Sequence, residues 1–544
     1  MKRFIDNYNG DSFDIIVIGG GITGAAVAYD AASRGLSVAL LEKQDFGCAT
    51  SAATSKMIHG GLRYLAYYEF GIVRESLRER RILSNIAPNF VYPQPVIITS
   101  YDNSFANGLR GLKVALRMYN TLAFDKGFTW DKSKKIPGHK VLSPEEVVAR
   151  EPNIRADELK GGMLYSDGVS LCPERLTLAF IKSAVRAGAR VANYAKVENF
   201  IFSEAGKING VRVKNLMTGE DLEITGSLVI NCGGPWADII LGLVDPKSAD
   251  KKLKRSEGIH LITRKLVDGH IVSRANQKGS YFSLIPWRGH TLIGTTDKEY
   301  IGAPDDYQVT REAIQELIDD VNEGFGREPL TYDDVLYAYG GLRPLVEDRT
   351  KDSYESSRKY EIYDNSKDGF DGLITVEGGK YTTSRNLARN VIKLASRKLG
   401  RRIGRCNTAK HRLAGCDITD MNAFIDRLKI NNHGLTRTTL DWLARHYGTD
   451  FRKVADLAQT DKSLAEPLDQ DGEILAQVVF AVREEMALTL KDIFLRRTGL
   501  GTLGAPPDGV IDKVADLAAQ ELGWGEARKA AEINEVIKAL RLPE

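Results

Sequence analysis

Cysteine and long apolar stretches are scarce in this sequence of 544 residues. Its cysteines form no CxxC pair and follow no regular spacing: Cys48, Cys172, Cys232, Cys406 and Cys416. Neither a disulfide framework nor a zinc site is therefore expected, and we predict that the protein binds no metal. No uncharged apolar run reaches the roughly 18 to 20 residues that cross a bilayer, and residues 1–14 contain no signal-peptide core. We expect a cytoplasmic protein that is dissolved or attached to a membrane surface.

An excess of charge of one sign is also missing. The formal net charge is +3, so the composition gives no sign of a nucleic-acid partner. Internal repeats and low-complexity linkers are absent from the sequence as well. The length exceeds what one hydrophobic core usually supports and predicts two or three domains.

What the sequence does contain is a strand, a glycine-rich turn and a helix of small residues, all predicted within residues 14–35. Gly19 allows the tight turn, Gly21 lets the backbone approach a pyrophosphate, and Gly24 lets the helix pack closely on the strand. The helix amino terminus would face the phosphates with unpaired N–H groups and a positive dipole end. Glu42 ends the next strand, where a carboxylate can accept hydrogen bonds from ribose hydroxyls. The unit predicts a dinucleotide site that is open to either NAD or FAD.

Three later segments are expected to return to the cofactor. Residues 48–65 are rich in Ser, Thr and Gly and offer hydroxyl and backbone donors. The glycines of residues 229–236 mark a close backbone approach, and residues 372–400 predict a strand, a glycine turn and a second helix. These segments supply further predicted cofactor residues: Thr50, Ser51, Ser55, Lys56, His59, Gly60, Gly233, Gly379, Lys380, Tyr381 and Thr382.

The predicted fold class is α/β with an interrupted, Rossmann-like nucleotide-binding domain formed by residues 1–100, 150–245 and 340–402. Residues 101–149 and 246–339 contain short alternating runs and predict an antiparallel β-sheet substrate domain with a helix near 310–323. Residues 403–544 predict a C-terminal α-helical domain. Such an interruption is common in FAD enzymes and seldom needed by NAD dehydrogenases.

Six motifs carry a family resemblance: IGGGITGAAVAYDAASRG, TSKMIHGGLRYL, INCGGPW, IGTTDKEYIG, GGLRPL and GGKYTTSRNLA. In order and spacing the chain resembles the FAD-dependent glycerol-3-phosphate dehydrogenases, over nearly its whole length. The resemblance implies FAD as cofactor, with the backbone of Val197 pairing with the adenine. It also implies oxidation of sn-glycerol 3-phosphate to dihydroxyacetone phosphate, hydride transfer to the flavin, and transfer of electrons to quinone by a peripheral membrane enzyme.

Three residues depart from the family pattern. Ala26 replaces a third glycine on the helix and should slightly widen the contact between helix and strand. Glu257 stands where a lysine is common, and Ser384 stands where a tyrosine is usual. The charge reversal at Glu257 leaves the details of substrate binding open.

Three cations lie in glycine-rich turns, where side chains often belong to binding or catalytic sites: Arg63, Arg343 and Lys380. Arginine suits bidentate phosphate recognition, and lysine can stabilise phosphate or a developing alkoxide. We predict that these residues bind the substrate and that Arg343 and Lys380 also take part in catalysis. Structural ion pairs are the alternative.

His260 is the predicted proton acceptor, because a histidine can be neutral near working pH. A purely structural histidine is the alternative. Tyr64 and Thr382 are predicted to hydrogen-bond the substrate, although Tyr64 could equally belong to the core. His59 is expected to shape its turn.

Residues 109–124 have a basic amphipathic pattern that suits an anionic membrane surface or a buried helix with basic flanks. The C-terminal helices suggest a packing domain or a homodimer contact. Three other functions remain open: an oxygen-using glycerol-3-phosphate oxidase, a dehydrogenase of another polyol phosphate such as a tetritol phosphate, and a flavin-binding regulatory protein without turnover.

Overall fold

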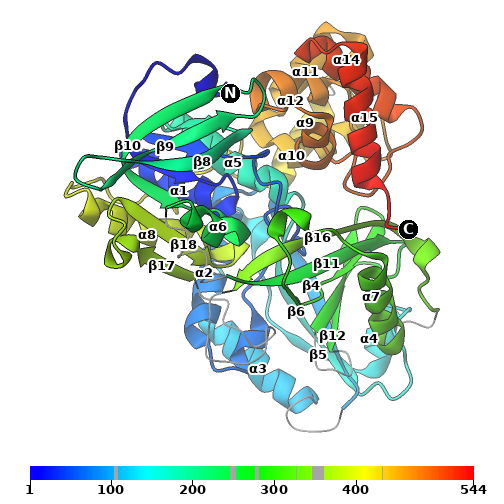
Figure 1. Ribbon diagram of the computed structural model, residues 1–544. Coiled ribbons are helices and arrows are strands. Elements are labelled where there is room, and N and C mark those ends of the chain that lie inside the picture. The colour runs from blue at the N-terminus through cyan, green and yellow to red at the C-terminus, as the bar shows by residue number, and fades with distance from the viewer. Residues whose placement is uncertain (103–107, 245–252, 276–280, 326–327, 346–359, 432) are drawn as a thin grey trace.

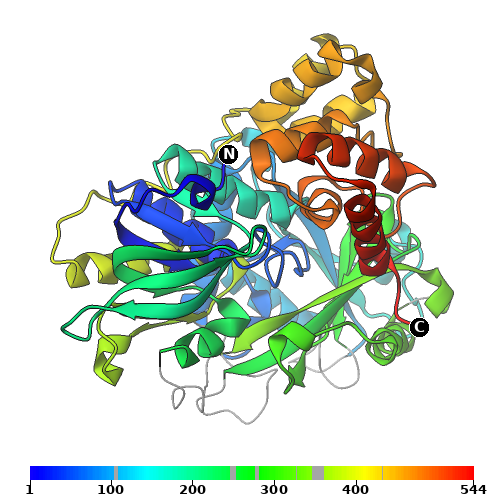
Figure 2. The ribbon, with the colours of Figure 1, turned by 45° about the horizontal axis from the view of Figure 1, so that its top comes forward.

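The computed structural model describes residues 1–102, 108–244, 253–275, 281–325, 328–345, 360–431 and 433–544. Two β-sheets lie side by side, and a group of helices from the C-terminal part of the chain lies above their junction (Figure 1). The same arrangement is seen when the top of the molecule is turned forward (Figure 2).

The first sheet contains the predicted nucleotide-binding unit. Its strand order is β17–β18–β10–β1–β2–β7, and all neighbours pair in parallel except β17 with β18. The strands are β1 (Phe13–Ile18), β2 (Val38–Leu41), β7 (Arg190–Ala192), β10 (Asp221–Asn231), β17 (Tyr360–Asp364) and β18 (Leu373–Gly378). The prediction of a Rossmann-like α/β fold is confirmed.

Helices cover one face of this sheet and an antiparallel hairpin covers the other. The helices α1 (Ile22–Ala32), α5 (Pro173–Arg186) and α8 (Ser384–Lys398) share one buried cluster with the sheet. The hairpin strands β8 (Ala195–Phe202) and β9 (Ile208–Asn215) continue into β10 and pack on the opposite side. Gly206 turns this hairpin with a φ of +77°, a conformation that glycine adopts without strain.

The second sheet forms the wall opposite the nucleotide unit. Its order is β15–β11–β14–β13–β12–β4–β6–β3, with β16 paired to β11 and β5 paired to β6. The strands are β3 (Met57–Ile58), β4 (Val91–Ser100), β5 (Lys140–Leu142), β6 (Gly161–Ser170), β11 (Lys254–Thr263), β12 (Ile271–Ala275), β13 (Tyr281–Trp287), β14 (His290–Gly294), β15 (Lys298–Tyr300) and β16 (Val335–Leu345).

Two details differ from the sequence prediction. Strands β4 and β6 and residues 340–345 of β16 pair within the second sheet, whereas the sequence assigned these residues to the nucleotide-binding domain. The pairing of β4 with β12 is parallel, so the sheet is not wholly antiparallel. The sequence of an apolar strand does not by itself specify which other strand it pairs with. The domain boundaries stay a prediction, and the one near residue 246 lies outside the described residues.

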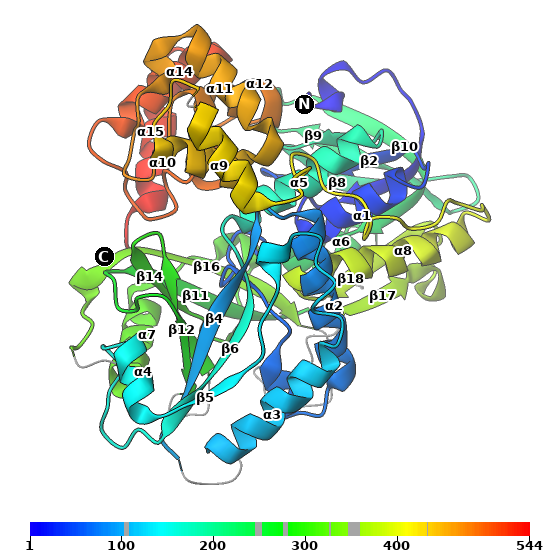
Figure 3. The same cartoon turned by 180° about the vertical axis from the view of Figure 1, so that it is seen from behind.

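The remaining helices flank the second sheet or form the C-terminal group. Around the sheet lie α2 (Phe70–Ile86), α3 (Leu109–Leu122), α4 (Pro144–Arg150) and α7 (Arg311–Gly324), and α6 (Ala237–Gly242) follows β10. Seen from behind, α3 projects at the far end from the C-terminal helices (Figure 3). That group comprises α9 (Met421–Asn431), α10 (Arg437–Tyr447), α11 (Phe451–Thr460), α12 (Ala476–Glu485), α13 (Leu490–Asp492), α14 (Val510–Leu522) and α15 (Glu526–Leu540). None of the helices in the described ranges is long and apolar enough to cross a membrane.

Candidate active site

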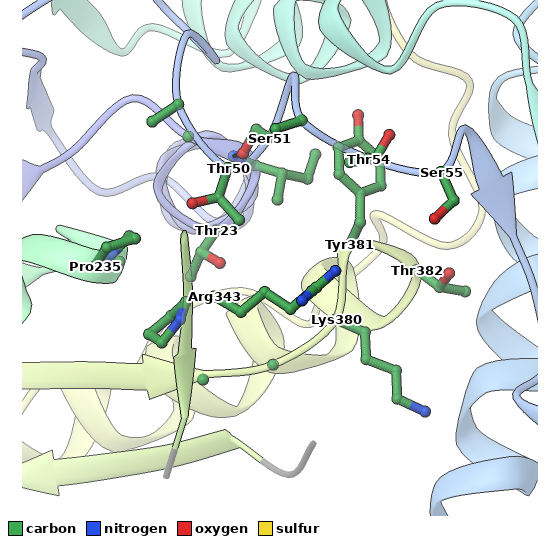
Figure 4. Close-up of a pocket in the computed structure, with 18 of the residues that line it drawn as sticks. Thr23, Thr50, Ser51, Thr54, Ser55, Pro235, Arg343, Lys380, Tyr381 and Thr382 are labelled. Atoms are coloured by element: carbon green, nitrogen blue, oxygen red, sulfur yellow. Dashed lines mark hydrogen bonds between the residues drawn. The ribbon is translucent and has the colours of Figure 1, made fainter. Parts of the chain in front are cut away.

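A cavity of about 1370 Å³ lies between the two sheets and is lined by both. Most of the predicted site residues meet there: Gly19, Gly21, Glu42, Thr50, Ser51, Ser55, His59, Arg63, Tyr64, Val197, Gly233, His260, Arg343, Gly379, Lys380, Tyr381 and Thr382. Figure 4 shows Thr50, Ser51, Thr54 and Ser55 along one loop, opposite the turn that carries Lys380, Tyr381 and Thr382. The side chain of Arg343 extends between them.

The glycine turn has the tight geometry that a dinucleotide requires. Gly19 has a φ of +104°, and a Cβ atom there would lie 2.5 Å from the carbonyl oxygen of Cys232. A Cβ at Gly24 would lie 1.9 Å from the carbonyl oxygen of Gly19. Gly24 does not line the cavity, and its role is to let α1 approach the turn. Ala26 is buried in the same helix, and its effect on the contact between helix and strand stays a prediction.

The loop after β2 completes the nucleotide end of the cavity. The Glu42 carboxylate accepts hydrogen bonds from the Gly20 N–H at 2.6 Å and the Gln44 N–H at 2.8 Å. Burial raises its pKa, although two N–H donors oppose that shift. Ser51 Oγ accepts a hydrogen bond from the Ile22 N–H at 2.9 Å and so satisfies one donor at the start of α1. The carboxylate, the close-packed glycines and the helix amino terminus fit an FAD.

Two of the predicted cofactor residues, Lys56 and Gly60, lie beside the cavity and do not line it. The Lys56 ammonium is buried in an ion pair with Glu174. The N–H of Gly60 is directed at the Asp167 carboxylate, 3.3 Å from each oxygen, and a Cβ at Gly60 would lie 2.2 Å from the Tyr119 hydroxyl. These partners are 118 and 107 residues away in the chain, so no local pattern indicated them.

Two cations lie beside the ring of Tyr64, which belongs to the short 3-10 helix Leu62–Leu65. The Lys380 Nζ lies 3.7 Å from the centroid of the Tyr64 ring, and the Arg63 guanidinium lies 5.1 Å from it. Lys380 also lies 3.4 Å from Ser76 Oγ. Burial lowers the pKa of His59 to about 4, and Lys380 and Arg63 add to that effect against the opposing charge of Asp167. His59 is therefore neutral at physiological pH.

Arg343, on β16, is held in one orientation by hydrogen bonds. Its Nη1 donates to the carbonyl oxygen of Glu257 at 3.0 Å, and its Nη2 donates to Thr295 Oγ1 at 2.6 Å. Its Nη1 also lies 3.7 Å from Asp297 Oδ1. We did not anticipate Thr295 and Asp297, although both lie in the IGTTDKEYIG motif and line the cavity.

His260 is buried on β11 and contacts Ser55, in the segment of residues 48–65 that is rich in Ser, Thr and Gly. Its Nε2 lies 2.9 Å from Ser55 Oγ, whereas its Nδ1 has no hydrogen-bond partner in the part of the chain that the structure describes. Burial and the positive charges of Arg343 and Lys56 hold the pKa of His260 well below its ordinary value. The imidazole is therefore neutral, and the same effects make it a weaker base than an exposed histidine.

The two other departures from the family pattern do not add side chains to the cavity wall. Glu257 is half-buried and contributes its backbone carbonyl, which binds Arg343. Ser384 is buried at the first turn of α8. Neither residue is among those that line the cavity.

The cavity combines a glycine turn suited to binding a dinucleotide with cations from both walls. Cations and a neutral imidazole close to a flavin suit the oxidation of a phosphorylated alcohol, because they can fix the phosphate and take the hydroxyl proton. Among the described residues, no group of three or more His, Cys, Asp or Glu side chains could hold a metal.

Comparison with known proteins agrees with this geometry. Residues 14–385 match the profile of the FAD dependent oxidoreductase family, and residues 406–529 match the C-terminal domain of alpha-glycerophosphate oxidase. A glycerol-3-phosphate dehydrogenase of Synechocystis sp. is 35% identical over 513 residues, which cover 92% of this chain and 91% of that protein. An aerobic glycerol-3-phosphate dehydrogenase of Staphylococcus aureus is 32% identical over 558 residues, with 98% and 95% covered.

Solved structures show the same relationship. The X-ray structure of the glycerol-3-phosphate dehydrogenase from Bacillus halodurans, complexed with FAD, has a TM-score of 0.77 and 29% identity, and covers 97% of this chain and 95% of that one. The L-alpha-glycerophosphate oxidase of Mycoplasma pneumoniae, at 18% identity and a TM-score of 0.55, covers 73% of this chain and 98% of its own and shares the fold. The chain belongs to the family of FAD-dependent glycerol-3-phosphate dehydrogenases.

Proposed function

We propose that this protein oxidises sn-glycerol 3-phosphate to dihydroxyacetone phosphate with FAD and passes the electrons to a quinone. The observation that carries the proposal is the convergence of Arg63, Lys380, Arg343 and His260 on one cavity beside the glycine turn. The names of the Synechocystis and Staphylococcus aureus relatives support the same substrate.

Each of these residues has a proposed role. Arg63, Arg343 and Lys380 hold the phosphate, with hydrogen bonds from Tyr64 and Thr382 to the rest of the substrate. Arg343 and Lys380 also stabilise negative charge that develops on the hydroxyl oxygen. Bound FAD supplies the acceptor for the hydride that leaves the secondary carbon.

His260 receives the hydroxyl proton in this proposal. Its Nε2 is bonded to Ser55, whose hydroxyl lines the cavity. The substrate proton therefore passes to Ser55 Oγ while the proton of Ser55 passes to Nε2. A phosphate dianion at Arg343 offsets one of the charges that depress the pKa of His260, so substrate binding strengthens this base.

Delivery of electrons to a quinone at a membrane is supported by α3. Its Leu116 and Tyr119 are buried, while Val114 and Met118 are exposed and line the large cavity. Its basic residues Arg110, Lys113 and Arg117 are exposed as well. A basic and apolar helix face suits an anionic membrane surface, and we propose peripheral attachment there.

Anaerobic bleaching of the purified flavoprotein tests the substrate and the reaction together. Glycerol 3-phosphate should bleach the flavin absorbance, and glycerol, which lacks the phosphate, should not. Faster bleaching by another polyol phosphate would replace the proposed substrate, and no bleaching by any of them would leave a binding protein without turnover. Reoxidation by a soluble quinone should be faster than by oxygen, and abundant peroxide would indicate an oxidase.

A further inference from the structure

A buried ionic cluster joins the C-terminal helices to the loop that begins at Glu42. Asp45, which has no exposed surface, accepts hydrogen bonds from Arg496 Nε at 2.5 Å and from two nitrogens of Arg497 at 2.7 Å each. Burial alone would raise the pKa of Asp45, but Arg497 and Arg496 lower it to about 2. The aspartate is therefore charged at any physiological pH, and both arginines pair with it.

The two arginines end a short π-helix, Ile493–Arg497. Single π turns are rare and occur frequently at functional sites. Arg496 also pairs with Asp492 at 2.6 Å. The carbonyl oxygen of Arg497 accepts a hydrogen bond from Arg175 Nη1, on α5, at 2.7 Å. The π-helix is thus anchored at its end as well as through its side chains.

The same C-terminal segment holds a second loop, between β7 and β8. Asn193 Nδ2 donates to Asp45 Oδ1 at 3.1 Å and to the carbonyl oxygen of Met486 at 3.0 Å. The Tyr194 hydroxyl donates to Asp492 Oδ1 at 2.7 Å. Tyr194 and Met486 both have a positive φ, 52° and 54°. Such conformations are strained for non-glycine residues and persist where surrounding contacts impose them.

The loop that begins at Glu42 and the loop between β7 and β8 both lead directly into the nucleotide end of the cavity. The first contains Glu42 and continues to Thr50 and Ser51, and the second continues to Val197. The loops are also bonded to each other, because the Tyr194 N–H donates to the Gln44 carbonyl oxygen and the Ala195 N–H donates to that of Glu42. A displacement of Asp45 would therefore shift the walls of the cavity on two sides.

We propose that the C-terminal domain positions the FAD-binding loops, with Arg496 and Arg497 acting through Asp45 as positioning residues for the cofactor. This role rests on the FAD site of the proposed function and is independent of the substrate. The C-terminal helices make no contribution to the cavity lining among the described residues, so their effect on FAD is transmitted through the two loops.

The test compares FAD binding by apoprotein variants, measured by flavin fluorescence titration, with the melting temperature of each apoprotein. The double variant D45N/R497Q removes one charge of each sign and leaves Arg496 paired with Asp492, so no buried charge loses its partner. R497K keeps the charge and loses the two-nitrogen contact. The matched control is R288M, which breaks the contacts of the C-terminal domain with the second sheet through Asp471 and Gly499.

We expect the FAD dissociation constant to rise about tenfold or more in D45N/R497Q and by less in R497K. It should change by less than about twofold in R288M, even where the melting temperature falls. The proposal is wrong if R497K and D45N/R497Q bind FAD like the unaltered protein, or if R288M weakens FAD equally for each degree of lost stability. If D45N/R497Q does not fold, R497K decides. Failure of the unaltered protein to bind FAD would instead refute the cofactor site itself.

Discussion

The imidazole of His260 lies between two strand neighbours of very different size. On one side β14 has Gly294 opposite it, where a Cβ would lie 2.4 Å from the histidine ring. On the other side β16 has Tyr339, whose ring stacks on the imidazole at 5.0 Å and 16°. The hydroxyl of Tyr339 donates to the carbonyl oxygen of Thr54. These contacts fix the ring with its Nε2 toward Ser55.

Replacing His260 with asparagine should slow flavin bleaching by glycerol 3-phosphate by about 100-fold to 10,000-fold, because the proton acceptor is lost. FAD affinity should be unchanged. The measurement is anaerobic stopped-flow absorbance. Ser55→Ala should also slow bleaching, and Ser55→Thr, which keeps a hydroxyl, should recover part of the rate. A His260→Asn variant that bleaches at the normal rate would assign the proton to another group.

The charge reversal at Glu257 should have little effect on substrate binding. Glu257→Gln should change the KM for glycerol 3-phosphate by less than about threefold, because the side chain is outside the cavity and Arg343 is held by the backbone carbonyl. Arg343→Lys should raise KM about tenfold or more, since it loses the planar fork that binds phosphate. Steady-state kinetics with both variants test this, and equal effects would show that the Glu257 side chain acts on the substrate.

At the scale of elements, α3 is buried on one face and exposed on the other, and its attachment to a membrane stays a prediction. It packs through Leu116 and Tyr119 and still exposes basic and apolar side chains on its other face. Tyr68, on the turn before α2, is 80% exposed and lines the same cavity as the exposed apolar residues of α3. An exposed apolar patch of this kind is typical of a binding surface.

Reversing the charges of α3 should therefore weaken membrane binding. The variant carries Arg110→Glu, Lys113→Glu and Arg117→Glu, and its affinity for vesicles rich in anionic lipid should fall at least about tenfold, since each basic residue near the surface contributes about 1 kcal/mol. Co-sedimentation measures it. The control reverses three exposed basic residues of α8, Arg389, Lys393 and Arg397, where the charge change is the same. Equal losses in both variants would remove α3 as the membrane contact.

At the scale of the whole molecule, the C-terminal helices are tied to both sheets by buried charges. Arg288, on the turn after β13, pairs with Asp471, while Arg175, on α5, pairs with Glu485. Burial alone would raise the pKa of Glu485, but Arg175 and Lys182 lower it to about 2. Breaking one partner of such a pair is costly because the other charge stays buried.

Acid should loosen this assembly through His446, a buried residue of α10. Burial, with the nearby charges of Arg175, Arg288 and Arg445, holds the pKa of His446 well below its ordinary value. Below about pH 6.5 the unfolded chain gains a proton that the folded imidazole does not, so stability falls as the pH falls.

His446→Phe keeps an aromatic ring against Trp442, whose ring lies 3.9 Å from the imidazole, and removes the titration. Between pH 7 and 5 this variant should lose less stability than the unaltered protein, by on the order of 1 kcal/mol. Urea unfolding at the two pH values measures the difference.

Sequence by itself determined the glycine turn, the carboxylate of Glu42 and the order of strands and helices around them, because each depends on residues that are close in the chain. It also identified the family. Only the tertiary structure decided that Lys56 pairs with Glu174, that Gly60 faces Asp167, that β4 and β6 join the second sheet, and that Asp45 is held by the C-terminal arginines. The partners of Lys56, Gly60 and Asp45 are more than a hundred residues away in the chain. Their pairing follows from burial and charge compensation in the folded chain, and no local sequence pattern predicts it.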